Sequence, residues 1–176
     1  LCKENEKRAY KKRGSQNSHI SLAHEFVHLI TFNQKERLQR VQEEVWLNEA
    51  RAEYASTILG YDALSADSNM KRRIKSFLDD PNDSLVEWNG LPKDYGVANM
   101  FMRYLVDQYG VQILVDSLQA SKAGIESVTD ALGKAGFQED FADVFQNWTV
   151  AIFLNDCSYG PRYCYYDPYL VNLRVV

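Results

Sequence analysis

The residues best suited to chemistry are two histidines that flank a glutamate in the segment HEFVH at positions 24–28. A helix turns about 100° per residue, so His28 would lie about 40° round from His24 and one turn along, where both imidazoles can bind one metal ion. Glu25 would lie about 100° from His24, on the side of an open coordination position. This arrangement is typical of zinc hydrolases, in which a carboxylate contacts the activated water without binding the metal.

A third ligand is expected from the segment WLNEARAE at positions 46–53. A longer zinc motif with a third histidine is excluded, because Thr31 and Gln34 stand where that motif has Gly and His. Glu49 is the natural substitute, since two His, one Glu and one water form a known catalytic coordination with an exchangeable fourth position. The alternative is a chance match, which is disfavoured because two of the chain's three histidines lie in the first motif.

Glu53 lies one turn after Glu49 and so points to the same side of its helix. A metal-bound imidazole normally donates its other N–H to a carboxylate, and we expect Glu53 to accept this hydrogen bond from His24. The alternative for Glu53 is a solvated glutamate on a helix surface.

Hydrolysis of a peptide also needs a donor for the oxyanion of the tetrahedral intermediate. The remaining histidine, His19, would face away from His24 on the same helix. Tyr95 is the candidate, because it lies at the start of an expected helix and precedes Gly96, which allows close approach of a backbone. The alternative is a tyrosine that packs against the protein and keeps its hydroxyl in water.

These motifs resemble the gluzincin metallopeptidases, the clan that includes thermolysin and aminopeptidase N. HEFVH, WLNEA and the later segment YGVANMFMRYLVDQYG at positions 95–110 are most similar to the bacterial hyicolysin-like family, and the similarity extends from about Leu22 to Ala151. The first two motifs are specific and the third is moderately so.

The resemblance implies a role for each matching position. In the family the positions that match His24, His28 and Glu49 bind zinc, and the position that matches Glu25 is the general base. The position that matches Glu53 supports a histidine, although thermolysin-like members have the shorter aspartate there.

The expected fold is mainly α, a zincin-like catalytic domain with a helical lower lobe that carries the active-site helix. Little or no upstream β-sheet is expected, because 23 residues precede His24. We divide the chain into a charged N-terminal segment (1–17), a helical zinc-peptidase catalytic domain (18–154) and an extended C-terminal segment rich in Tyr and Cys (155–176).

Apolar periodicity and helix-breaking residues predict the individual helices. After the helix that carries HEFVH, they are expected over about residues 39–59, 65–78, 93–109, 111–121, 124–134 and 138–154. On the first helix we expect an apolar stripe opposite the histidines to face the core, formed by Leu22, Phe26, Leu29 and Ile30.

Composition excludes several other classes of function. The net charge of −4 is not typical of a nucleic-acid-binding domain, and no apolar segment approaches the ~20 residues needed to span a bilayer. No Asp-rich segment has the spacing of an EF-hand. Cys157 and Cys164 enclose a short loop and either form a disulfide or stay as thiols. The cysteines favour a secreted or cell-surface protein, bacterial by its resemblance. Because the chain begins at Leu1 without a signal pattern, we expect it to be part of a longer precursor with further domains.

The sequence therefore predicts a zinc-dependent endopeptidase that acts on protein or peptide substrates and binds one Zn²⁺ per chain. Two alternatives remain open. One is an aminopeptidase of the same clan, and the other is a noncatalytic binding module that keeps the zincin helices. Glu25 favours an enzyme over the binding module, since a module that only binds has no need for a proton carrier beside the metal.

Overall fold

The computed structural model describes residues 18–62 and 68–175, and these fold into packed helices with no strand among them. Residues 18–31 form the first described helix, here called the histidine helix. The elements that follow are η1 (Phe32–Gln39, a π-helix), α2 (Val45–Ile58), α3 (Asn69–Asp79), α4 (Pro92–Tyr109), α5 (Gln112–Gln119), α6 (Gly124–Lys134), α7 (Phe141–Leu154) and η2 (Cys157–Tyr159, a 3₁₀ turn). The prediction of a mainly α fold is confirmed.

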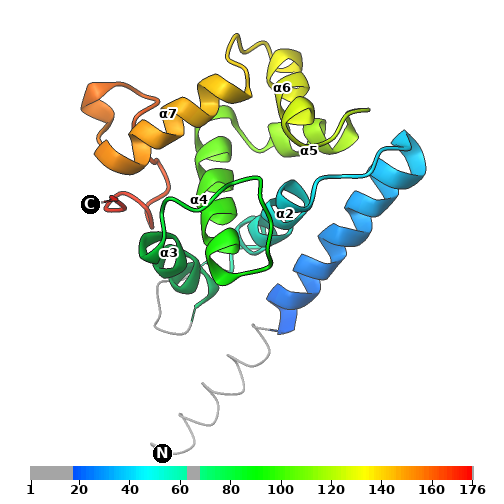
Figure 1. The fold of residues 1–176 in the computed structure, drawn as a ribbon, viewed down its shortest axis with the longest axis horizontal. Helices are drawn as coiled ribbons and strands as arrows, with labels where there is room; N and C mark the ends of the chain where they lie inside the picture. Colours follow the sequence, from blue (N-terminus) through cyan, green and yellow to red (C-terminus); the bar gives the residue numbers. More distant parts are fainter. Residues whose placement is uncertain (1–17, 63–67, 176) are drawn as a thin grey trace, which may run out of the picture.

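Helix α4 runs through the middle of the molecule, with α2, α3, α5 and α7 packed around it (Figure 1). Its side chains are mostly apolar and buried, and Phe101 contacts the aromatic rings of Trp46, Phe141 and Trp148. Gly96 lets α4 approach α3, because a Cβ built there would lie 2.6 Å from the backbone nitrogen of Phe77. The close approach expected at this glycine therefore serves the packing of two helices.

Three of the expected helices begin later than the sequence predicted, and the one expected from about residue 138 begins at Phe141, after the cap Asp140. The helix expected from about residue 39 begins at Val45, because Arg40 adopts a left-handed conformation (φ 60°) and residues 40–44 leave the helix. Buried Glu43 explains this departure: its carboxylate accepts hydrogen bonds from Arg51 Nη1 (2.6 Å) and from the Gly124 N–H (2.8 Å), which a continuous helix would not allow. Helix α3 begins after Ser68, whose hydroxyl caps it, and the expected cap at Ser65 lies outside the described residues.

The prediction that the apolar stripe of the histidine helix faces the core is wrong for three of its four members. Leu22, Phe26 and Leu29 are 68%, 59% and 64% exposed, while Ile30 is half-buried. The histidine face of this helix points towards α2, so the opposite face points away from the rest of the described chain. Figure 1 shows the helix, in blue, lying along one side of the molecule.

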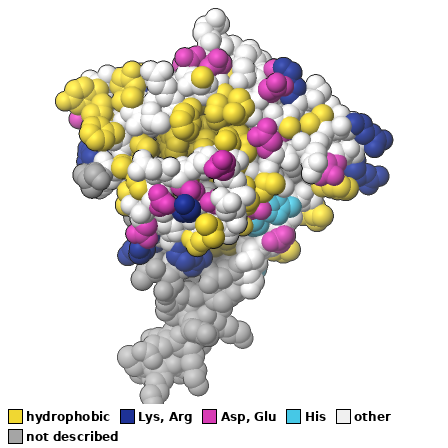
Figure 2. Space-filling view, viewed as in Figure 1, with side chains coloured by type: hydrophobic (Ala, Val, Ile, Leu, Met, Phe, Trp, Pro, Cys, Tyr) yellow, Lys and Arg dark blue, Asp and Glu magenta, His cyan; other side chains and the backbone are white. Residues whose placement is uncertain are grey.

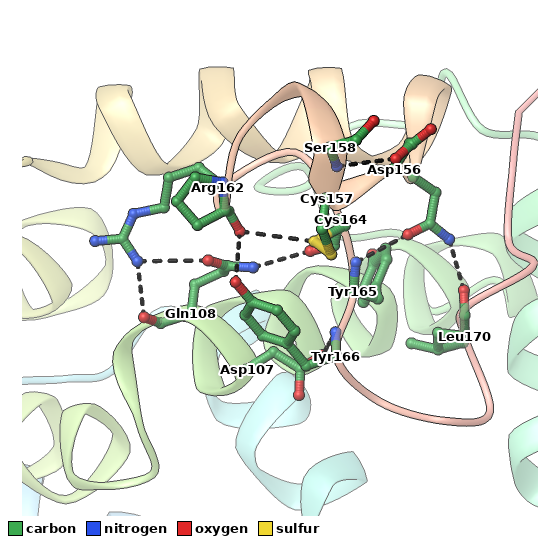
Figure 3. Close-up of a disulfide and its surroundings, with 12 residues drawn as sticks. Asp107, Gln108, Asp156, Cys157, Ser158, Arg162, Cys164, Tyr165, Tyr166 and Leu170 are labelled. Atoms are coloured by element: carbon green, nitrogen blue, oxygen red, sulfur yellow. Dashed lines mark hydrogen bonds between the residues drawn. A yellow bond between two sulfur atoms is a disulfide. The ribbon is translucent and has the colours of Figure 1, made fainter.

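The C-terminal segment is not extended as expected, because residues 155–175 form the η2 turn and a series of further turns against α4 and α7. Cys157 and Cys164 form a disulfide (Figure 3). The Gln108 side chain of α4 donates to the Cys164 carbonyl (2.9 Å), and Arg162 donates to the Gln108 carbonyl (2.8 Å). These bonds attach the disulfide loop to the central helix.

None of the helices in the described part of the chain combines the length and apolar character that a membrane span requires.

Candidate metal centre

The three predicted metal ligands come together between the histidine helix and α2. His24 Nε2 lies 3.1 Å from His28 Nε2 and 3.3 Å from Glu49 Oε2, and His28 Nε2 lies 3.6 Å from Glu49 Oε1. Within residues 18–62 and 68–175, this is the one group of three or more His, Cys, Asp or Glu side chains whose ligand atoms converge within 4.8 Å. Figure 2 shows histidine at the surface of this face, beside acidic side chains.

The spacing of these atoms fits a tetrahedral zinc ion. Ligands held about 2.0 to 2.1 Å from a tetrahedral metal lie about 3.3 to 3.4 Å from one another. The two contacts of His24 Nε2, with His28 Nε2 (3.1 Å) and Glu49 Oε2 (3.3 Å), lie close to that value, and His28 Nε2 lies 3.6 Å from the other oxygen, Glu49 Oε1. Glu49 Oε2 is also buried without a hydrogen-bond partner, although it lies beside His24 Nε2. A cation between these atoms would satisfy that oxygen, since a buried carboxylate oxygen without a partner is costly.

The orientation of His28 is fixed by Asn48, a residue to which the sequence motifs assign no role. His28 Nδ1 lies 3.0 Å from Asn48 Oδ1, which can only accept a hydrogen bond. The proton therefore sits on Nδ1, and Nε2 keeps the lone pair that a metal needs. The signal in the sequence was weak, because an asparagine beside a candidate ligand can equally lie on the solvent-facing side of its helix.

Glu53 takes the corresponding place beside the other histidine, since its Oε1 lies 3.5 Å from His24 Nδ1. The carboxylate is 4% exposed and is held from the far side by Arg73 of α3, through Nε to Oε2 (2.6 Å) and Nη2 to Oε1 (2.7 Å). Asn69 adds a third hydrogen bond to Glu53 (3.1 Å). Burial raises the pKa of Glu53, but the hydrogen bonds and charge of Arg73, the hydrogen bond from Asn69 and the nearby His24 together outweigh it and keep the pKa below its usual value. Glu53 therefore stays ionised at neutral pH.

Glu49 and its neighbours raise the pKa of His24 above its usual value. The adjacent Glu49 carboxylate, 3.3 Å away, raises the pKa of His24, burial opposes this, and the negative charges of Glu53, Glu49 and Glu25 add to the increase. An imidazole surrounded by three carboxylates attracts any cation, whether a proton or a metal ion.

Glu25 and Tyr95 line one cavity of about 370 Å³ beside His24. Its walls come from the histidine helix, α2, α3 and the start of α4, and include Ala52, Glu53 and Arg73. Glu25 is exposed on the cavity wall, and it carries no metal-ligand contact in the group described above. The cavity therefore places Glu25 and Tyr95 beside His24, one of the three candidate ligands.

Tyr95 is held between two neighbours at the start of α4. The guanidinium of Arg73 lies 4.5 Å from the centre of the phenol ring, and Trp88 packs edge-on against it at 4.8 Å. Burial and the charge of Glu49 raise the pKa of Tyr95, so its hydroxyl keeps a proton to donate at neutral pH. His19 lies outside the site, with its ring 6.2 Å from that of Tyr61.

No family model matches this chain, and no curated protein matches it significantly. The resemblance to gluzincins therefore depends on the motifs alone.

Proposed function

We propose that this protein is a zinc-dependent peptidase of the gluzincin type, with Zn²⁺ held by His24, His28 and Glu49. The observation that carries the proposal is the convergence of His24, His28 and Glu49, each of which offers one ligand atom within 4.8 Å of the other two. Two imidazoles and one carboxylate leave a fourth position for water or substrate, as in catalytic rather than structural zinc sites. One metal ion per chain is expected.

When bound, zinc would lower the pKa of water towards about 7 and polarise the scissile carbonyl. Glu25 would accept the proton of the attacking water and deliver it to the leaving amine, a task that requires a carboxylate with free access to the cavity. Tyr95 would donate a hydrogen bond to the oxyanion. Asn48 and Glu53 would keep the two imidazoles in the tautomer that binds metal.

The zincin-like catalytic fold, protein or peptide substrates and an exported location belong to the same proposal. A disulfide between Cys157 and Cys164 supports export, because disulfides persist in oxidising compartments. Within this proposal we take an endopeptidase as the first candidate and an aminopeptidase of the same clan as the alternative.

The second candidate is a noncatalytic module that keeps the metal site. Glu25 separates the two candidates, because it lines the cavity beside His24 without belonging to the ligand group. A module that only binds has no use for a proton carrier at that place.

The test combines metal analysis with one conservative variant. We expect about one zinc per chain, and Glu25→Gln should lower the rate of cleavage of a denatured protein by about 10²- to 10⁴-fold while the zinc content stays unchanged. Glu36→Gln is the matched control, because Glu36 is an exposed glutamate on η1 outside the cavity. Full activity in Glu25→Gln would refute the assigned base, and a zinc-loaded wild type that cleaves nothing would favour the binding module.

A further inference from the structure

The cavity beside His24 is lined by two arginines of α3, Arg72 and Arg73. Arg73 is committed to Glu53 through two short bonds of 2.6 and 2.7 Å, so its charge is already matched. Arg72 is exposed, and neither the metal ligands nor the residues that support them depend on it. A guanidinium at the wall of a cavity can meet a molecule that enters it.

The place of Arg72 is fixed by the side chains that support the metal centre. Arg72 Nη2 donates to Asn69 Oδ1 (3.2 Å), and Asn69 Nδ2 donates in turn to Glu53 Oε2 (3.1 Å). Glu53 Oε1 lies 3.5 Å from His24 Nδ1, so three successive contacts link the guanidinium to a candidate metal ligand. An extended peptide spans about 3.3 to 3.6 Å per residue, which brings groups within about three residues of the scissile bond into reach of Arg72.

The start of α3 adds positive potential to this wall of the cavity. The helix begins at Asn69, and its first turn contains no acidic residue, while Lys71, Arg72 and Arg73 follow one another there. The N-terminus of a helix carries a partial positive charge, which attracts anions and disfavours cations. Basic residues are therefore placed where the helix itself does not favour them, and an incoming anion would offset both charges.

With zinc bound, the positive charge around the cavity would exceed the negative charge. Zinc would bring two positive charges, and Arg72 and Arg73 bring one each. Three carboxylates stand against them, those of Glu25, Glu49 and Glu53. One positive charge remains, and a single carboxylate on the substrate would match it.

We propose that Arg72 determines specificity by binding a carboxylate of the substrate close to the scissile bond. The planar guanidinium suits a carboxylate, because two parallel N–H groups can donate to its two oxygens. That carboxylate belongs to an Asp or Glu side chain or to a free C-terminus, since both present the same group. The inference depends on the proposed function, because it names the class of peptide that the site accepts.

Matched peptides test the preference in the zinc-loaded protein. One series places Glu at each position within three residues of the scissile bond, and its partner series has Gln at the same place. We expect kcat/KM to be about tenfold higher for the Glu peptide at the preferred position, because a charged hydrogen-bonded pair is lost in the Gln peptide. Each peptide is also made with a free and an amidated C-terminus, so that the difference which matters identifies the source of the carboxylate.

Two variants assign the preference to Arg72. Arg72→Gln should lower kcat/KM for the carboxylate peptide to the value for its neutral partner, and leave the neutral peptide and the zinc content unchanged. Arg72→Glu should reverse the preference, so that a peptide with Lys at that position becomes the better substrate. Lys71→Gln is the matched control, since it removes an exposed positive charge next to Arg72 but outside the cavity.

Binding gives a second measurement that does not require turnover. Calorimetry with zinc-loaded Glu25→Gln should show about tenfold tighter binding of the carboxylate peptide than of its neutral partner. Added salt should reduce this difference, because Arg72 is exposed.

Equal kcat/KM for all the matched peptides, or a preference that persists in Arg72→Gln, would overturn the inference and leave the peptidase proposal in place. Binding that depends on Arg72 in a protein that cleaves no peptide would do the opposite, since it would remove the peptidase proposal and keep Arg72 as the carboxylate-binding residue.

Discussion

Substitution of Arg73 tests whether the candidate metal centre depends on Glu53 being held in place, because Arg73 binds Glu53 from a different helix. The pair is bidentate, with contacts of 2.6 and 2.7 Å, and the side chains are 18% and 4% exposed. Removing one partner of a fully buried ion pair costs about 3 to 5 kcal/mol. Arg73 is partly solvated and Asn69 still binds the carboxylate, so we expect Arg73→Met to lower the free energy of unfolding by about 2 to 3 kcal/mol.

Two measurements follow from this value. In EDTA at pH 7.5, a loss of about 2 to 3 kcal/mol should lower the urea midpoint by about 1 M or more. Zinc affinity should fall by about 10- to 100-fold, because the carboxylate that supports His24 is no longer held in place. Lys71→Met is the matched control, since it removes an exposed positive charge from the same helix outside the cavity.

A double variant separates the ion pair from general damage to α3. In Arg73→Met with Glu53→Gln the unpaired charge is gone, so the combined loss should be smaller than the sum of the single losses by about 1 kcal/mol or more. Additive losses, or an Arg73→Met protein with the urea midpoint and zinc affinity of the wild type, would refute the role assigned to Arg73.

Three further predictions concern pH, packing and the disulfide. Zinc and a proton compete for His24, whose pKa is raised, so zinc affinity should fall as the pH drops through that pKa, beginning above about 6.5. In competition with a chelator, the affinity should fall by about tenfold per pH unit for each proton displaced. An affinity that does not change between pH 8 and pH 6 would contradict this. Gly96→Ala should destabilise the protein by about 1 to 3 kcal/mol in urea denaturation, because the new Cβ would lie 2.6 Å from the Phe77 nitrogen. Gly133→Ala is the control and should be neutral or stabilising, because Gly133 is a helical position with open space around it. Replacing Cys157 and Cys164 by Ala should lower the melting temperature by the equivalent of about 2 kcal/mol, since the closed loop is short, and a melt unaffected by reducing agent would argue against this contribution.

The parts of the site that sequence predicts are those set by local geometry. His24 and His28 share a helix, so their separation follows from the helical repeat and needs no knowledge of the fold. Glu49 could be found because few side chains can complete such a ligand set. Helix α6 was predicted with its observed bounds, since glycine marks its start and apolar residues repeat along one face.

The parts that sequence did not predict depend on which elements meet. Arg73 is an ordinary charged residue on an amphipathic helix until α3 packs beside α2 and brings it to Glu53. The end of the preceding helix likewise depends on residues far along the chain. Buried Lys35 donates to the Ser117 carbonyl (2.6 Å), and buried Glu43 accepts from the Gly124 N–H (2.8 Å). An apolar stripe shows that a helix has two faces, but it does not say which of them meets the rest of the chain.

The proposed metal ligands come from two elements that are attached to the protein with unequal strength. Helix α2 is anchored in the core by Trp46, Leu47 and Ala50, all fully buried. The histidine helix has one buried residue, Thr31, among positions 18–31, and its firmest attachment is Lys35 in the following π-helix. A metal ion shared by both elements therefore adds a cross-link where packing is sparse, so part of the binding free energy goes into docking the histidine helix. Metal affinity should in consequence depend on contacts that never touch the ion, with Lys35 foremost among them.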